Sequence, residues 1–175
     1  LVVLPSELPP LGNSETITED PTFGGTKTNC IVVSNQLEID DTTASSPTAT
    51  YLMQEEADYI DTGSTRSAVI TGSVTFERKY DNGTLLWDAI PQLFDTWPDK
   101  FDTWTDENAE FGDVSATVFV RATPDDPSGT PIWGAWSLAN GATVVGRAFE
   151  FKAELNSTNK DFTPSIITLE GKVEY

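Results

Sequence analysis

The sequence predicts an all-β protein, an antiparallel β-sandwich of jelly-roll or carbohydrate-binding-module type. Two observations lead to this fold class: about seven short segments alternate apolar and polar residues, and turn-forming Gly, Pro, Asn and Asp residues separate them. A third is that no stretch has the spacing of a long amphipathic helix. At 175 residues, the chain suits one domain with a sizeable core.

The N-terminal part differs in composition from the rest of the chain. Residues 1–29 are rich in Pro, Thr, Ser, Glu and Gly, so we expect an extended linker or arm, followed by a β-sandwich domain at residues 30–175. The chain begins with Leu1 rather than Met, which favours one piece of a longer polypeptide. Strands are expected at 30–39, within 50–61 as one long or two short strands, and at 68–80, 114–122 and 167–175.

The segment from Trp133 to Leu155 organises the rest of the fold. Asn140-Gly141 predicts a tight hairpin turn that joins two strands, because both residues tolerate positive φ. Beyond this turn, the alternation places Arg147 on the same face as the apolar residues Val145, Phe149, Phe151, Ala153 and Leu155. One charged side chain is therefore expected to point the same way as the core.

Arg147 needs a specific explanation, because an unpaired buried guanidinium is very costly. One interpretation is an ion pair with a loop aspartate such as Asp95 or Asp102. The other is a position at the rim of the core, where the guanidinium takes part in binding. The sequence leaves both open.

The charge balance disfavours several partners. The chain has 28 acidic and 10 basic residues, a net charge of −18, so it would repel the phosphates of nucleic acids and anionic membrane surfaces. The longest apolar runs fall far short of the roughly 20 residues that span a bilayer, so we expect no membrane insertion. The acidity is otherwise explained by solubility.

The residue types also disfavour most enzyme classes. Histidine is absent and Cys30 is the single cysteine, which removes Ser-His-Asp and Cys-His nucleophiles and histidine zinc sites. No Gly-rich motif has the spacing that holds phosphates. A pair of carboxylates across a sugar bond could still make a glycosidase. We expect a protein that is not an enzyme, with a glycosidase as the least favoured reading.

Tryptophan supplies the candidate binding residues, since an exposed indole can stack on a sugar ring. Three of the five tryptophans lie in residues 85–106, where Phe94-Asp95-Thr96-Trp97 is repeated as Phe101-Asp102-Thr103-Trp104. Trp133 and Trp136 are three residues apart, so in a strand they would point to opposite faces. The candidate ligand-binding residues are Trp97, Trp104, Trp136 and Arg147. Packing in the core is the alternative for each tryptophan.

A cluster of aspartates raises the question of calcium, which prefers oxygen ligands. The candidates are Asp95, Asp99, Asp102 and Asp106, but their spacing differs from that of a calcium-binding loop. The favoured explanation is that these aspartates cap turns and solvate an otherwise apolar stretch. We therefore expect no cofactor, with Ca²⁺ as the one ion to test.

The region from about residue 86 to residue 175 resembles the C-terminal region of host-specificity proteins, the tail-tip or central-fibre proteins of long-tailed bacteriophages. The resemblance rests on the order of four motifs. They are the repeated Phe-Asp-Thr-Trp block, residues 116–123 with Asp125-Asp126-Pro127, the Trp133-Gly134-Ala135-Trp136 segment, and residues 147–155 before Asn156-Ser157-Thr158. Residues 1–85 match only in general character.

The resemblance implies a non-catalytic virion protein in the phage tail. It implies a homotrimer that contacts neighbouring tail proteins and contributes to attachment to a host-surface receptor or glycan. The alternative is a carbohydrate-binding module of a secreted or surface protein, which would be a monomer with a shallow aromatic groove. Oligomeric state separates these two readings.

Overall fold

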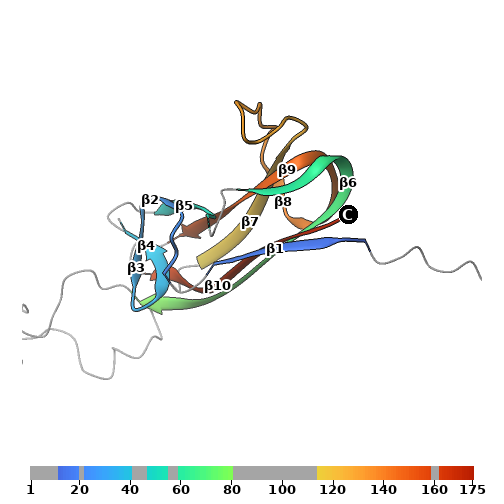
Figure 1. Ribbon diagram of the computed structural model, residues 1–175. Helices are drawn as coiled ribbons and strands as arrows, with labels where there is room; N and C mark the ends of the chain where they lie inside the picture. The colour runs from blue at the N-terminus through green and yellow to red at the C-terminus, as the bar shows by residue number, and fades with distance from the viewer. Residues whose placement is uncertain (1–11, 20–21, 41–46, 55–58, 81–113, 159–161) are drawn as a thin grey trace, which may run out of the picture.

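The structure is a computed structural model that describes residues 12–19, 22–40, 47–54, 59–80, 114–158 and 162–175 (Figure 1). All regular elements in these ranges are β-strands, which form one antiparallel sheet nearly closed into a barrel or sandwich. The predicted all-β class is confirmed. The strands are β1 (Ser14–Glu19), β2 (Thr26–Thr28), β3 (Cys30–Val33), β4 (Gln36–Ile39), β5 (Thr48–Leu52), β6 (Ile60–Tyr80), β7 (Val114–Thr123), β8 (Ser137–Leu138), β9 (Asn140–Ser157) and β10 (Phe162–Glu174).

Three long strands hold the sheet together. The order of hydrogen-bonded neighbours is β2-β5-β9-β6-β10-β4-β3, with β7 also paired to β9, β8 to β7, and β1 to β10. β6, β9 and β10 bend across the domain, as Figure 1 shows for their curved ribbons. Register irregularities interrupt β6 opposite β9 and β10 opposite β6. Such bulges bend a strand and increase its twist, which lets one strand serve two parts of a closing sheet.

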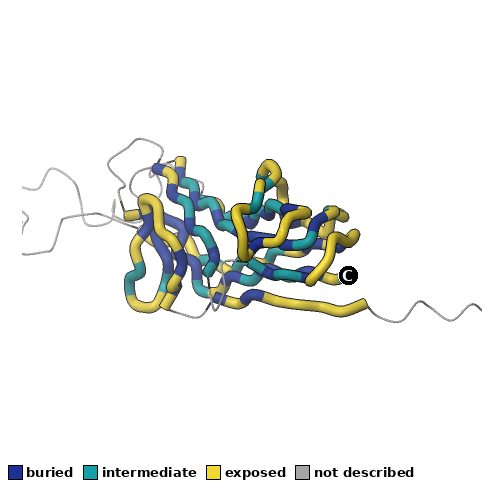
Figure 2. The backbone as a smooth tube through the Cα atoms, turned by 45° about the horizontal axis from the view of Figure 1, so that its top comes forward, coloured by how far each residue is buried: buried dark blue, intermediate teal, exposed yellow. Residues whose placement is uncertain are grey.

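β9 is the centre of the sheet, as the sequence indicated. It pairs with β5 and β6 along one edge and with β7 along the other. Four side chains of the predicted inner face are completely buried: Phe149, Phe151, Ala153 and Leu155. Val145 is 66% exposed, so the inner face opens to solvent at the start of the strand. Figure 2 shows this change along the strands from buried to exposed residues.

The predicted hairpin at Asn140-Gly141 is wrong. β8 pairs with β7 rather than with β9, and Gly141 falls at a register shift where Ile70 opposes Ala142 and Thr71 opposes Asn140. Gly141 has φ 87°, so its conformational freedom serves a bulge instead of a turn.

A tight hairpin lies elsewhere, in the segment 30–39 that the sequence predicted as one strand. β3 and β4 pair from Cys30↔Ile39 to Val33↔Gln36, and Ser34 and Asn35 join them. Both loop residues have positive φ, 51° and 64°, which matches the backbone of a two-residue primed turn. The turn was missed because serine is a weak signal for this conformation.

The expected N-terminal arm is part of the domain where the structure describes it. β1 pairs with β10 over six residues, from Ser14↔Glu174 to Glu19↔Leu169. Phe23 is completely buried and meets Tyr51 edge to face, with ring centroids 5.7 Å apart. The sandwich therefore begins before residue 30. The polar composition of this segment hid the strand, because only Ile17 and Glu19 of β1 are buried.

Candidate functional site

Two of the four candidate binding residues, Trp136 and Arg147, lie in the part of the chain that the structure describes. The other two, Trp97 and Trp104, lie outside the described residues. The calcium candidates Asp95, Asp99, Asp102 and Asp106 lie outside them as well.

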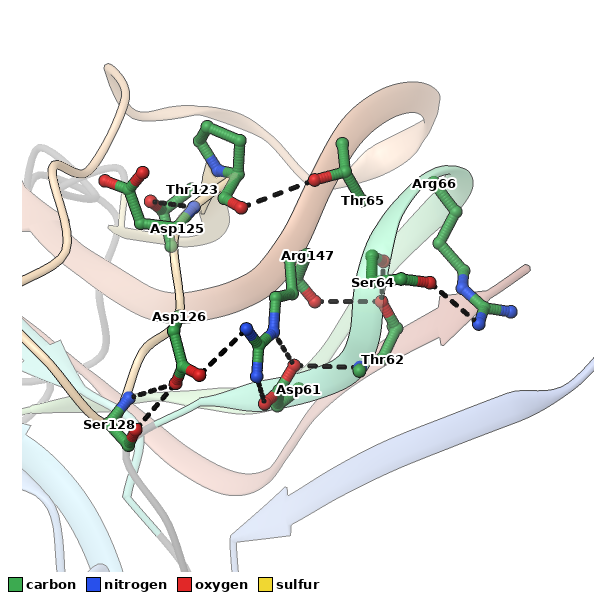
Figure 3. A network of polar contacts seen from close by, with 12 residues as sticks. Asp61, Thr62, Ser64, Thr65, Arg66, Thr123, Asp125, Asp126, Ser128 and Arg147 are labelled. Atoms are coloured by element: carbon green, nitrogen blue, oxygen red, sulfur yellow. Dashed lines mark hydrogen bonds and ion pairs between the residues drawn. The ribbon is translucent and has the colours of Figure 1, made fainter.

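Arg147 lies at the rim of the core and is fully paired. Its side chain is 23% exposed, and it donates through Nε to Asp61 Oδ1 at 3.0 Å and through Nη2 to Asp61 Oδ2 at 3.1 Å. The third nitrogen, Nη1, lies 2.9 Å from Asp126 Oδ2 (Figure 3). The ion pair that the sequence suggested is present, with Asp61 of β6 and Asp126 of the loop as partners in place of Asp95 or Asp102, and the binding role stays a prediction. This bidentate geometry is the strong form of an arginine–carboxylate pair.

The Arg147 pairs fix the loop that follows β7. Asp126 Oδ1 accepts hydrogen bonds from the backbone N–H of Ser128 at 3.0 Å and from its hydroxyl at 2.6 Å. In the same loop, Asp125 Oδ2 accepts from the backbone N–H of Ile132 at 2.8 Å. Because each guanidinium nitrogen of Arg147 contacts an aspartate, this residue acts as a clamp that holds the loop to β6 and β9.

The clamp should give the domain an acid-sensitive component of stability. The Arg147 guanidinium lowers the pKa of Asp61, and hydrogen bonds from Ser128, with a contribution from Arg147, lower that of Asp126. A lowered folded-state pKa adds stability that is present above the unfolded pKa, about 3.9, and is lost as pH falls through the folded values. We expect Arg147→Met to lower the melting temperature at neutral pH, and the gap to wild type to shrink below about pH 4.

Thermal melts from neutral to strongly acidic pH test this expectation. The matched control is Arg66→Met, because Arg66 donates to the hydroxyl of Ser64 at 3.1 Å and has no carboxylate partner among the described residues. The control gap should stay constant with pH. A constant gap for Arg147→Met as well would contradict the coupling.

A second group of side chains gathers on the outer face of β7 and β9. Phe119 opposes Lys152 and Arg121 opposes Glu150 in the antiparallel register, so these four side chains share one face of the sheet. Trp133 and Trp136, from the segment before β8, pack onto the two cations. We call this surface the cation–aromatic face; its members are Phe119, Arg121, Trp133, Trp136, Glu150 and Lys152.

Cations and rings are interleaved on this face. The Arg121 guanidinium carbon lies 5.2 Å from the ring centroid of Trp133 and 4.6 Å from that of Trp136. Lys152 Nζ lies 4.8 Å from the Trp136 centroid and 5.2 Å from that of Phe119. Each such contact contributes about 0.5–2 kcal/mol, the larger value where water is excluded. Trp136 is therefore held from the sheet side by two cations at once.

Each cation also has a carboxylate partner. Arg121 Nε donates to Glu150, whose side chain is only 7% exposed. Lys152 Nζ lies 2.5 Å from Glu154 Oε1, and the Glu154 side chain is 35% exposed. The two charges are thus matched locally, and the buried carboxylate depends on Arg121.

Trp133 and Trp136 do not point to opposite faces. The opposite-face expectation required a strand, but residues 131–136 have no regular structure and both indoles contact the same guanidinium. Trp136 is partly buried. Tyr59 extends the surface, with its ring centroid 6.4 Å from that of Trp133.

Sequence reasoning missed Arg121 and Lys152. Their alternation along each strand was readable, but the pairing of residue 121 with 150 and of 119 with 152 depends on the register between strands that are far apart in the chain. One signal was available: Arg121 is the only cation of β7, and Lys152 and Arg147 are the only cations of β9.

The acids on this surface do not have the arrangement of a glycosidase. Glu150 and Glu154 are four residues apart on one strand, which separates their Cα atoms by about 13 Å. The two carboxyl groups of a glycosidase face each other across about 5–9.5 Å. Both glutamates are instead engaged with cations. The geometry suits ligand contact better than acid–base chemistry.

Among the described residues, no three Cys, Asp or Glu side chains gather in a group that could hold a metal ion. The same ranges include no helix with the length and apolar character needed to cross a membrane. The chain matches no protein-family model and has no significant match among curated proteins or solved structures.

Proposed function

We propose that this chain is a non-catalytic attachment domain of a bacteriophage tail tip, and that its cation–aromatic face binds a glycan of the host surface. The observation that carries the binding role is Trp136, held over the β7–β9 sheet by Arg121 and Lys152 with part of its indole open to solvent. A ring fixed in this way can receive a ligand without losing side-chain freedom on binding, which favours affinity.

The tail-tip assignment rests on the order of sequence motifs. Two of these motifs meet in the fold: Trp136 of the Trp133-Gly134-Ala135-Trp136 segment packs on Lys152, which lies in the 147–155 motif on β9. A homotrimer, contacts with neighbouring tail proteins and a place in the virion tail are parts of the same proposal.

A carbohydrate-binding module of a secreted or surface protein is the second candidate, since the same face would serve it. A light-scattering mass of the full chain, measured with and without Ca²⁺, separates the two. A trimer favours the tail-tip domain, whereas a monomer that binds purified polysaccharide but no particular cell favours the module. Release of reducing sugar from host polysaccharide would instead point to the glycosidase.

Trp136→Ala should remove most of the binding. We expect the affinity for host cells or their isolated polysaccharide to fall about tenfold or more, because central aromatic contacts often contribute more than about 1.4 kcal/mol. The measurement is a binding isotherm of the fluorescently labelled protein on intact candidate host cells. The fold should persist, since Trp136 lies outside the buried core.

Ile132→Ala is the matched control for this prediction. Ile132 is 79% exposed and lies four residues away in the same segment, but it has no part in the cation–aromatic face. Its loss should leave binding unchanged. Equal loss of binding in both variants would place the ligand on the loop tip instead, and unchanged binding by Trp136→Ala would contradict the proposed site.

A further inference from the structure

We infer that the ligand of the cation–aromatic face is an uncharged saccharide, a neutral hexopyranose unit rather than a uronic acid or a phosphorylated sugar. This inference rests on the proposed glycan-binding function. Two cations on a surface that binds sugars would ordinarily point to an anionic ligand. The contacts of Arg121 and Lys152 indicate the opposite.

Arg121 is committed to its neighbours. Its Nε donates to the buried Glu150, while two indoles lie within 5.2 Å of its guanidinium carbon. An anionic ligand that drew the guanidinium away from Glu150 would leave this carboxylate without its partner inside the protein, and an anion bound to the Nη groups in place would share the cation with Glu150. An unpaired buried carboxylate is strongly unfavourable, so the exchange is disfavoured.

Lys152 is committed in the same way. Its side chain is only 14% exposed, its ammonium lies between the rings of Trp136 and Phe119, and Glu154 Oε1 is 2.5 Å away. A ligand anion would have to displace Glu154 or share the ammonium with it, and Glu154 is tethered two residues away on the same strand. The field of the whole chain, with its net charge of −18, adds repulsion of any anionic polymer.

The remaining groups match a neutral sugar. The Trp136 indole, a residue that is only partly buried, offers an apolar surface for the C–H face of a pyranose ring. Glu154 lies beside that indole, because Lys152 contacts both, and its side chain is 35% exposed. A carboxylate accepts hydrogen bonds from sugar hydroxyls and repels sugar carboxylates and phosphates. Stacking and hydroxyl recognition are thus available together without any free positive charge.

A polysaccharide panel tests the inference. Affinity electrophoresis of the full chain would use dextran, mannan and galactan as neutral probes, and alginate and polygalacturonate as uronic-acid probes. We expect retention by at least one neutral probe, none by the acidic probes, and a change below about twofold between low and about 0.5 M salt, because no net charge is neutralised on binding. Trp136→Ala should lose this retention while Ile132→Ala keeps it.

The outcomes separate the inference from the function on which it rests. Salt-sensitive retention by alginate or polygalacturonate, lost in Trp136→Ala, would overturn the neutral-ligand inference and keep the glycan-binding function. Retention by no probe and no binding of isolated host polysaccharide would overturn the function itself. Retention that survives Trp136→Ala would overturn the assignment of the ligand to this face.

A charge variant examines the reason for the selectivity. Glu154→Gln keeps a side chain of the same shape at an exposed position but leaves Lys152 without its carboxylate. We expect this variant to gain salt-sensitive retention by alginate, while its melting temperature stays near that of wild type. A variant that rejects alginate as wild type does would contradict the role of charge matching.

Discussion

Phe151→Ala is expected to destabilise the domain by about 3–5 kcal/mol, the usual cost of removing a buried aromatic ring. Phe151 is completely buried on β9, opposite the equally buried Val120 of β7. Its ring lies against Gly171 of β10, where a Cβ atom would come within 2.6 Å of Phe151 Cγ. Because glycine has no side chain to move into the space, the cavity cannot refill, and the cost should lie near the upper end.

Urea denaturation at neutral pH, followed by far-ultraviolet circular dichroism, gives the free energy of unfolding for this test. Val145→Ala is the matched control on the same strand, because Val145 is 66% exposed. The control should change the free energy of unfolding by no more than about 0.5 kcal/mol. Similar losses in the free energy of unfolding for the two variants would contradict the description of β9 as exposed at Val145 and buried at Phe151.

Arg121→Met should be the other large effect, a loss of about 3 kcal/mol in the free energy of unfolding. The change keeps an unbranched apolar stem but leaves the Glu150 carboxylate, which is 7% exposed, without its cation. The two indoles that pack on the guanidinium also lose their support, so tryptophan emission should shift to longer wavelength before global unfolding.

The double variant Arg121→Met with Glu150→Leu separates charge from packing. Replacement of both partners by apolar groups of similar size removes the uncompensated carboxylate, so most of the lost stability should return. Tryptophan emission should remain shifted, because the cation is still missing. If the double variant were as unstable as the single one, the cost would come from packing around the indoles and not from the buried charge.

The alternation of apolar and polar residues was enough to predict the fold class and the central strand. Side chains two residues apart share a face of a strand, and this local rule identified Phe149, Phe151 and Leu155 as core residues without knowledge of their neighbours. The same rule found Arg147, and the cost of burying its charge predicted that it would be paired or at the rim. The strands at 68–80 and 114–122 followed equally directly.

Local rules did not fix which strands meet or in what register. Gly141 was expected in a turn but lies in a bulge. A positive φ is compatible with both, and only the pairing with β6 distinguishes them. Likewise, β1 belongs to the sheet because β10 offers it an edge, although its own composition resembles a linker. These outcomes depend on partners far away in the chain: residues 70–71 for the bulge at Gly141 and residues 169–174 for β1.

The sequence by itself therefore determined that this chain is a β-protein with a buried centre at residues 149–155, and that Arg147 is an exception requiring a partner. Only the tertiary structure decided that Asp61 and Asp126 are that partner pair, and that Arg121 and Lys152 support Trp136. The physical reason is that alternation along a strand is local, whereas an ion pair or a ring contact between strands depends on their register, which the packing of the whole core sets.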